Sequence, residues 1–143
     1  MPKVLVTGGA GFIGSHVVDA FIEKGYEVAV IDNLSTGNKA NLSKKAEFFE
    51  VDIRSKDLKN TMDKINPDII VHAAAQISVS ESMKDLRYDA EINICGILNI
   101  LQCFDFEKVP YFVFISTGGA IYGEQDNFLP LKIIRFVQKV HMA

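Results

Sequence analysis

The chain has 143 residues, of which 48% are hydrophobic and 23% are charged, and its net charge is −3. This length suits one domain, because a chain of this size can bury roughly two-thirds of its unfolded surface. The acidic balance leaves no basic stripe to neutralise phosphates, so we expect no nucleic-acid partner. No apolar run approaches a membrane span, and the N-terminus lacks a signal-peptide core. We therefore expect a cytoplasmic protein with no membrane anchor.

The two cysteines give no sign of a metal or redox site. Cys95 and Cys103 lie in the apolar stretch "EINICGILNILQCF", without a CxxC pair or clustered histidines. Free cysteines in such surroundings are usually buried. We therefore expect two ordinary buried thiols and no metal.

Apolar segments alternate with amphipathic ones along the chain. We predict strands over residues 3–7, 27–32, 47–52, 68–75 and 111–116, and helices over residues 12–24, 55–65 and 85–104. Strands that are apolar on both faces and separated by helices indicate a parallel sheet covered on both sides. The fold class is therefore α/β, a Rossmann-type doubly wound sheet of about five strands in the order 3-2-1-4-5. Its ligands bind at the carboxyl ends of the strands.

The stretch "VTGGAGFIGSH" carries the strongest functional signal. It lies between the first strand and the first helix, and its glycines satisfy both GxGxxG (Gly9, Gly11, Gly14) and GxxGxxG, which uses Gly8 instead of Gly9. Glycines in this context permit a tight turn and let backbone N–H groups approach a pyrophosphate at the helix N-terminus. We predict that Gly8, Gly11, Phe12, Ile13 and Gly14 contact a dinucleotide.

Asp32 ends the second strand, 18 residues after Gly14. A carboxylate at this place can accept hydrogen bonds from both ribose hydroxyls of NAD and repels the 2′-phosphate of NADP. No Lys or Arg precedes Lys39 to hold that phosphate. NAD is therefore the predicted cofactor, and the predicted contacts in this loop are Asp32, Asn33, Ser35, Thr36 and Gly37.

The ends of the third and fourth strands supply further candidates. Asp52 and Ile53 are placed for the adenine, with a helix-flanking role for Asp52 as the alternative. The small residues Ala73, Ala74 and Ala75, with Gln76, let the backbone pass close beneath a cofactor. Asn93 is disfavoured within a helix unless its amide has a task, such as bracing the pocket. His72 is expected to be a packed strand-end residue. The further predicted cofactor contacts are thus Asp52, Ile53, Ala73, Ala74, Ala75, Gln76 and Asn93.

Six segments occur in a characteristic order: "VTGGAGFIGSH", "DNLSTG", "VDI", "HAAAQ", "YDAEIN" and "STGGAIYG". Together, over about residues 3–123, they resemble the N-terminal half of the extended short-chain dehydrogenase/reductase family, in particular UDP-glucose 4-epimerases and related nucleotide-sugar epimerases. The resemblance implies tightly held, recycled NAD and a UDP-sugar substrate held by a smaller second domain. It implies oxidation of the hexose C4 to a keto group that is then reduced from its other face. It also implies a homodimer or larger assembly through the helix over residues 85–104.

The resemblance further implies three catalytic groups: a Ser or Thr hydroxyl, and the Tyr and Lys of a YxxxK motif. Lys⁺ near the Tyr lets a phenol with a pKa near 10 act as a base closer to neutrality. Thr117 is the predicted hydroxyl, with Ser116 as the alternative. The four tyrosines, Tyr26, Tyr88, Tyr111 and Tyr122, all lack Lys four residues later.

The family pattern stops after about residue 125. We therefore expect residues 1–125 to form part of an NAD-binding domain, residues 126–143 to form a helical tail outside the family pattern, and the sugar domain to be absent. The chain alone is expected to be inactive. One alternative is a sugar 4,6-dehydratase, which Gly118 and Gly119 disfavour because they stand where its acid/base pair would follow Thr117. Another is a non-catalytic, NAD-responsive module whose tail helix docks a partner.

Overall fold

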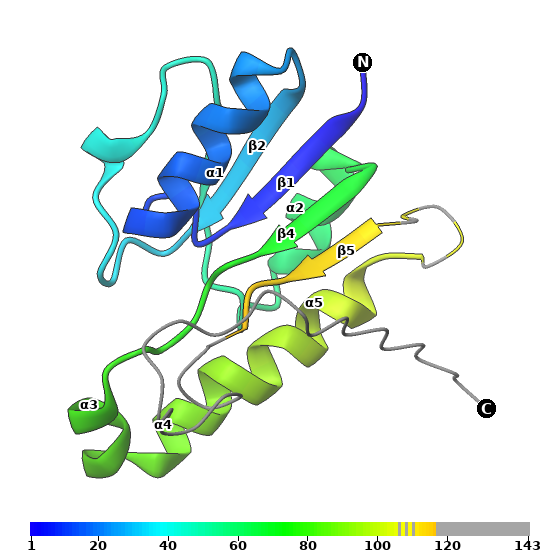
Figure 1. Ribbon diagram of the computed structural model, residues 1–143. Helices are drawn as coiled ribbons and strands as arrows, with labels where there is room; N and C mark the ends of the chain where they lie inside the picture. The colour runs from blue at the N-terminus through cyan, green and yellow to red at the C-terminus, as the bar shows by residue number, and fades with distance from the viewer. Residues whose placement is uncertain (106, 108, 110, 117–143) are drawn as a thin grey trace, which may run out of the picture.

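The computed structural model describes residues 1–105, 107, 109 and 111–116. Five parallel strands form one sheet in the order β3-β2-β1-β4-β5 (Figure 1), as predicted. The strands are β1 (Lys3–Thr7), β2 (Glu27–Asp32), β3 (Glu47–Glu50), β4 (Ile69–His72) and β5 (Tyr111–Phe114). The strand order reverses between β1 and β4. At such a point the connections leave a crevice at the carboxyl ends of the strands.

The helices flank the sheet. They are α1 (Phe12–Glu23), α2 (Leu58–Ile65), α3 (Val79–Lys84), α4 (Leu86–Ala90) and α5 (Ile97–Cys103), with a 3₁₀ turn η1 (Lys39–Asn41) and a π-helical segment η2 (Glu91–Gly96). The predicted helix over residues 85–104 is observed as the continuous run α4-η2-α5. The π segment at its centre has no signal in the sequence, and the short helix α3 was not predicted.

Several predicted elements are longer than the observed ones. Residues 51 and 52 lie beyond β3, residues 73–75 lie beyond β4, and residues 115 and 116 lie beyond β5. In each case the extended chain continues past the last pairing partner, as where Ala73 N still donates to Thr7 O at 3.0 Å. These segments therefore leave the sheet at the edge where ligands bind in folds of this kind. The predicted tail helix lies outside the described residues.

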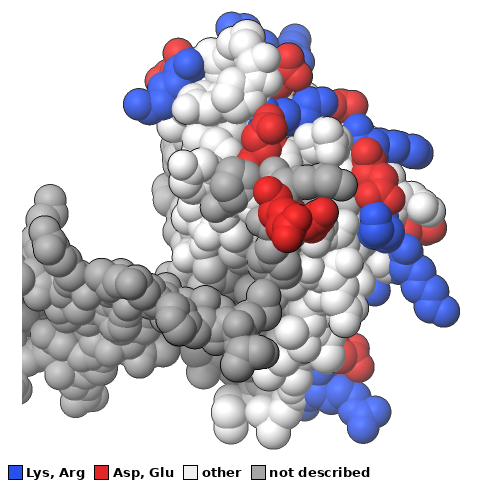
Figure 2. All heavy atoms as spheres, turned by 90° about the vertical axis from the view of Figure 1, so that its right-hand side faces the viewer, with Lys and Arg blue, Asp and Glu red and all other residues white. Residues whose placement is uncertain are grey.

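Charged side chains of both signs are interspersed on the face that Figure 2 shows, and no continuous basic stripe crosses it. Within the described part of the chain, no helix has the length and apolar character that a membrane crossing requires. The same residues contain no group of three or more His, Cys, Asp or Glu side chains that could hold a metal ion. Cys103 is buried as expected, whereas Cys95 is exposed. The expectation for Cys95 was wrong because it lies on the solvent side of η2.

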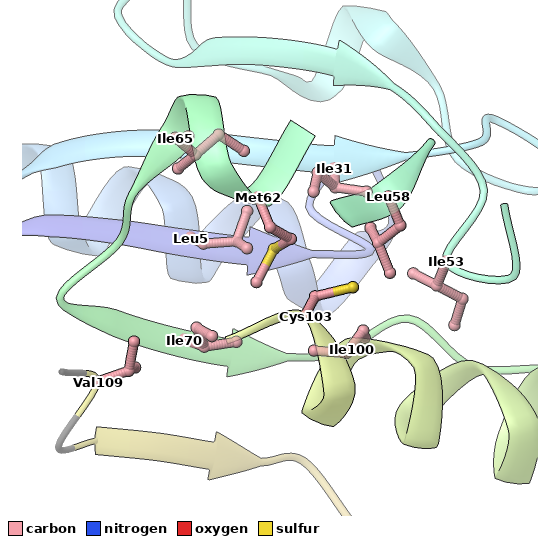
Figure 3. Packing of buried hydrophobic residues seen from close by; sticks show 11 residues of the cluster. Leu5, Ile31, Ile53, Leu58, Met62, Ile65, Ile70, Ile100, Cys103 and Val109 are labelled. Atoms are coloured by element: carbon pink, nitrogen blue, oxygen red, sulfur yellow. The ribbon is translucent and has the colours of Figure 1, made fainter. Parts of the chain in front are cut away.

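Alternate residues of each strand enter different hydrophobic layers, because successive side chains point to opposite faces of a sheet. Val4 and Val6 pack with Val18 of α1, whereas Leu5 packs on the opposite face. That second layer, shown in Figure 3, joins the strands to α2 and α5. Its buried residues are Leu5, Ala29, Ile31, Ile53, Leu58, Met62, Ile65, Ile70, Ile100, Cys103 and Val109. Side chains of other elements therefore pack on both faces of the sheet at β1, β2 and β4, whereas Val113 and Phe114 of β5 are about half exposed.

Candidate functional site

A groove of about 630 Å³ follows the carboxyl ends of the strands. Every predicted cofactor contact except Asn93 lines it: Gly8, Gly11, Phe12, Ile13, Gly14, Asp32, Asn33, Ser35, Thr36, Gly37, Asp52, Ile53, Ala73, Ala74, Ala75 and Gln76. The sequence analysis missed six further lining residues: Ile31, Val51, Ile77, Glu81, Tyr88 and Ile92. That the predicted residues contact a cofactor stays a prediction. The structure brings together segments separated by up to 84 positions in the chain, from Gly8 to Ile92.

The floor of the groove is a close crossing of two backbones. Gly8 has a φ of +71°, and a Cβ there would lie 2.6 Å from the backbone N of Ala74. Gly14 is equally restricted, because a Cβ would lie 2.1 Å from the carbonyl oxygen of Gly8. Both positions therefore exclude a side chain. Of the two glycine patterns, the one that begins at Gly8 describes the groove, since Gly9 instead packs toward Val30.

The N-terminus of α1 opens onto the groove. Gly11 is the N-cap and provides no side chain, and the first turn holds no acidic residue. Ser15 N donates to Gly11 O at 3.0 Å, but the N–H groups of Phe12, Ile13 and Gly14 have no hydrogen-bond partner among the described residues. Unpaired N–H groups at a helix N-terminus, aided by the helix dipole, favour a phosphate.

Asp32 is buried, and two backbone donors hold its carboxylate. Ala10 N donates to Oδ2 at 3.0 Å and Leu34 N donates to Oδ1 at 2.8 Å. Leu34 adopts a φ of +55°, a strained conformation for this residue type. A carboxylate offers about four acceptor positions, so about two remain for donors from the groove. The arrangement fits a pair of ribose hydroxyls.

No Lys or Arg lines the groove among the residues that the structure describes. Lys39, the nearest cation in the loop after Asp32, has its Nζ 5.0 Å from the centroid of the Phe48 ring. The loop itself folds back over the glycine turn, since Asn38 N and Asn41 Nδ2 each donate to Ala10 O at 3.0 Å. The charge pattern around Asp32 therefore matches the one that the sequence analysis associated with NAD.

Asp52 lies two residues beyond β3, with its carboxylate in a polar cluster. Arg54 N and Nε donate to Oδ1 at 2.8 and 2.9 Å, and Arg54 Nη2 donates to Oδ2 at 2.7 Å. Asn33 Nδ2 also donates to Oδ2, at 2.9 Å. The hydrogen bonds from the Arg54 side chain are the main reason that the Asp52 pKa lies well below its usual range. Asp52 is therefore an anion at any physiological pH.

His72 is a structural residue. It is 3% exposed, its Nδ1 lies 2.7 Å from Thr7 Oγ1, and its ring stacks on Phe114. Ala74 N donates to the same Thr7 oxygen at 3.4 Å, so the Thr7 hydroxyl links His72 to the backbone just after β4. Burial lowers the His72 pKa to about 4. The neutral ring therefore connects the ends of β1 and β4, as expected of a packed residue.

Asn93 braces the groove from behind. Gln76 N donates to its Oδ1 and its Nδ2 donates to Gln76 O, each at 2.9 Å. Nδ2 also donates to Asp89 Oδ1 at 3.1 Å, and Asp89 accepts a hydrogen bond from Ser82. The amide thus fixes the loop after β4 without lining the groove itself. Asn93 lies in η2, and π segments are frequent at functional sites.

Of the two predicted catalytic hydroxyls, the structure describes only that of Ser116. Ser116 is exposed and is the last described residue, and Thr117 lies outside the described residues.

Comparisons with known proteins agree on one family. The model of the NAD dependent epimerase/dehydratase family matches residues 4–135. The structure of a Thermotoga maritima UDP-glucose 4-epimerase with UDP-glucose is 46% identical, with a TM-score of 0.82 over 90% of this chain and 42% of that one. A Thermus thermophilus UDP-glucose 4-epimerase in complex with NAD is 45% identical, with a TM-score of 0.83 over 92% and 42%. A UDP-glucose 4-epimerase of Mycolicibacterium smegmatis is 40% identical over 126 residues, covering 85% and 40%.

The chain spans 42%, 40% and 39% of the length of three curated relatives. The family match also extends past residue 125, so the boundary proposed there stays a prediction. With a match over most of its length, the chain belongs to the NAD dependent epimerase/dehydratase family.

Proposed function

We propose that this chain is the NAD-binding portion of a UDP-glucose 4-epimerase-like isomerase. The observation that carries the proposal is the groove, which has unpaired N–H groups of α1 at one position and the Asp32 carboxylate at another. The N–H groups would hold the pyrophosphate, Asp32 would hold the adenosine ribose, and Asp52 would receive the adenine. When bound, NAD would take a hydride from the sugar C4 and return it.

The fit of the groove to NAD supports this assignment. The Gly8 and Gly14 positions admit no Cβ, so backbone atoms can approach a ligand closely. Asp32 keeps about two acceptor positions free, and among the described residues no cation lines the groove to bind a 2′-phosphate. NADP would therefore meet an uncompensated negative charge.

Asp32→Asn tests the assignment. The substitution keeps the side-chain shape, removes the charge and replaces one acceptor with a donor. We expect NAD affinity to fall about tenfold or more and the preference for NAD over NADP to narrow, because a charged acceptor contributes about 1.5–3 kcal/mol. Asp19→Asn, on the exposed side of α1, is the control and should change neither value. An unchanged NAD/NADP ratio in Asp32→Asn would contradict the assignment.

The substrate and reaction are proposed from the relatives. The intact enzyme would interconvert UDP-glucose and UDP-galactose, with Thr117, or Ser116 in its place, binding the sugar O4. The proton transfer would need a Tyr and a Lys that this sequence does not contain at YxxxK spacing. We therefore propose that the 143-residue chain alone does not catalyse epimerisation.

We also propose that the chain forms a homodimer through the helical run α4-η2-α5. Ile100 of this run is fully buried in the core, whereas Ile94 and Leu98 are 58% and 51% exposed. Together with exposed Cys95 they form an apolar face directed away from the sheet. Such a face suits pairing with a second copy.

A further inference from the structure

In the described part of the chain, Arg54 is the only residue that donates more than one hydrogen bond to the Asp52 carboxylate. Its backbone N–H, Nε and Nη2 supply three of the four hydrogen bonds on that carboxylate. Arg54 does not itself line the groove.

The guanidinium is itself held from two further directions. Its Cζ lies 5.3 Å from the ring centroid of Tyr88 in α4, a residue that lines the groove. Arg54 Nη1 lies 3.8 Å from Glu91 Oε2 in η2. The Arg54 side chain is 30% exposed and that of Asp52 is 26% exposed, so both are partly withdrawn from water. A bidentate arginine in this setting fixes orientation as well as charge.

This leaves Asp52 with one exchangeable acceptor position. The fourth hydrogen bond comes from Asn33 Nδ2, and Asn33 and Asp52 both line the groove. A donor entering between the ends of β2 and β3 can take the place of the Asn33 amide. The three donors from Arg54 remain, so the carboxylate cannot turn to suit a different ligand edge.

We propose that Arg54 is a positioning residue that makes Asp52 selective for a 6-aminopurine. The inference rests on the proposed NAD site and defines which base that site accepts. An amino group donates to the fixed Oδ2, whereas a carbonyl oxygen at the same purine position is repelled by it. Selectivity of this kind requires a carboxylate that cannot rotate toward the neighbouring ring N–H.

The test compares NAD with nicotinamide hypoxanthine dinucleotide, in which a carbonyl replaces the purine amino group. Both are titrated calorimetrically against the full chain. We expect the wild-type chain to bind NAD about tenfold more tightly, the value of one well-placed hydrogen bond. Arg54→Ala and Arg54→Lys should reduce this ratio to about twofold or less, because a lysine keeps the charge but cannot form the fork.

Arg87→Ala is the matched control. Arg87 is exposed and directly precedes Tyr88 in sequence, and its side chain forms no ion pair or hydrogen bond with the described residues, so its removal should leave the ratio unchanged. Equal binding of both dinucleotides by the wild-type chain, or an undiminished ratio in Arg54→Lys, would overturn the proposal while leaving the NAD site intact. Binding of neither dinucleotide would refute the NAD site itself, and this inference with it.

Discussion

Replacing Gly14 with alanine should damage the groove more than its helical position alone suggests. Gly14 lies in the first turn of α1, where alanine is favoured over glycine by about 1 kcal/mol. However, the new Cβ would lie 2.1 Å from Gly8 O, 2.8 Å from Gly8 C and 2.8 Å from Gly9 Cα. Non-bonded heavy atoms attract one another at about 3.5 Å, so the glycine turn must move.

The free energy of unfolding should fall by about 2 kcal/mol. Overpacking costs about 1–3 kcal/mol, and three backbone atoms within contact place Gly14→Ala at the upper end of that range. The helix preference for alanine offsets about 1 kcal/mol of this cost. For a chain of this size the loss corresponds to a decrease in Tm of about 6 °C. NAD affinity should fall as well, because the displaced turn carries the predicted phosphate contacts.

Gly25→Ala is a control that we expect to lose about as much stability as Gly14→Ala. Gly25 has a φ of +83°, which costs an alanine about 1–2 kcal/mol, but a Cβ there would meet only Met1 Cε at 3.5 Å. Thermal unfolding followed by circular dichroism gives both Tm values, and calorimetry gives NAD affinity. We expect both variants to be destabilised and only Gly14→Ala to lose NAD binding. A Gly14→Ala variant with the Tm and NAD affinity of the wild type would refute this reasoning.

Three further predictions concern pH, association and activity. Because the His72 pKa is lowered to about 4 from an ordinary value of 6.5, protons bind the unfolded state more readily. The free energy of unfolding should be highest above pH 6.5 and should decrease by up to about 1.4 kcal/mol per pH unit between pH 6.5 and 4. Urea titrations at several pH values should show a smaller decrease per pH unit in His72→Gln. An equal decrease in the variant would count against His72 as the group responsible. Leu98→Asp should convert a dimer into a monomer by light scattering, whereas a wild-type monomer would contradict the proposed interface. The chain should not convert UDP-galactose to UDP-glucose in a coupled assay; turnover that survives repurification and disappears in Thr117→Ala would show the opposite.

Local patterns predicted the parts of the fold and groove that depend on neighbouring residues. Alternation of apolar strands and helices gave the strand order, and the spacing from Gly8 to Gly14 located the turn at the head of α1. Asp32 could be placed because a strand-end carboxylate follows the glycine loop at a regular interval. The glycine turn and Asp32 both lie within the single unit β1-α1-β2.

Features that depend on tertiary contact were not predictable in this way. Tyr88 lines the groove because α4 packs beside the segment after β3, which no local spacing encodes. The positive φ of Leu34 arises because its N–H turns toward Asp32, although leucine itself gives no such signal. The prediction that residues 73–75 continue the strand after β4 was wrong, because small apolar residues suit a strand and a close backbone crossing equally well.

The central claim, that this chain forms an NAD site, is tested most directly by calorimetric titration of the wild-type chain with NAD and with NADP. We expect one NAD site per chain, with a dissociation constant below 1 mM, that is, binding stronger than about −4 kcal/mol, and weaker binding of NADP. Binding of NAD no tighter than millimolar, or a preference for NADP, would contradict the account.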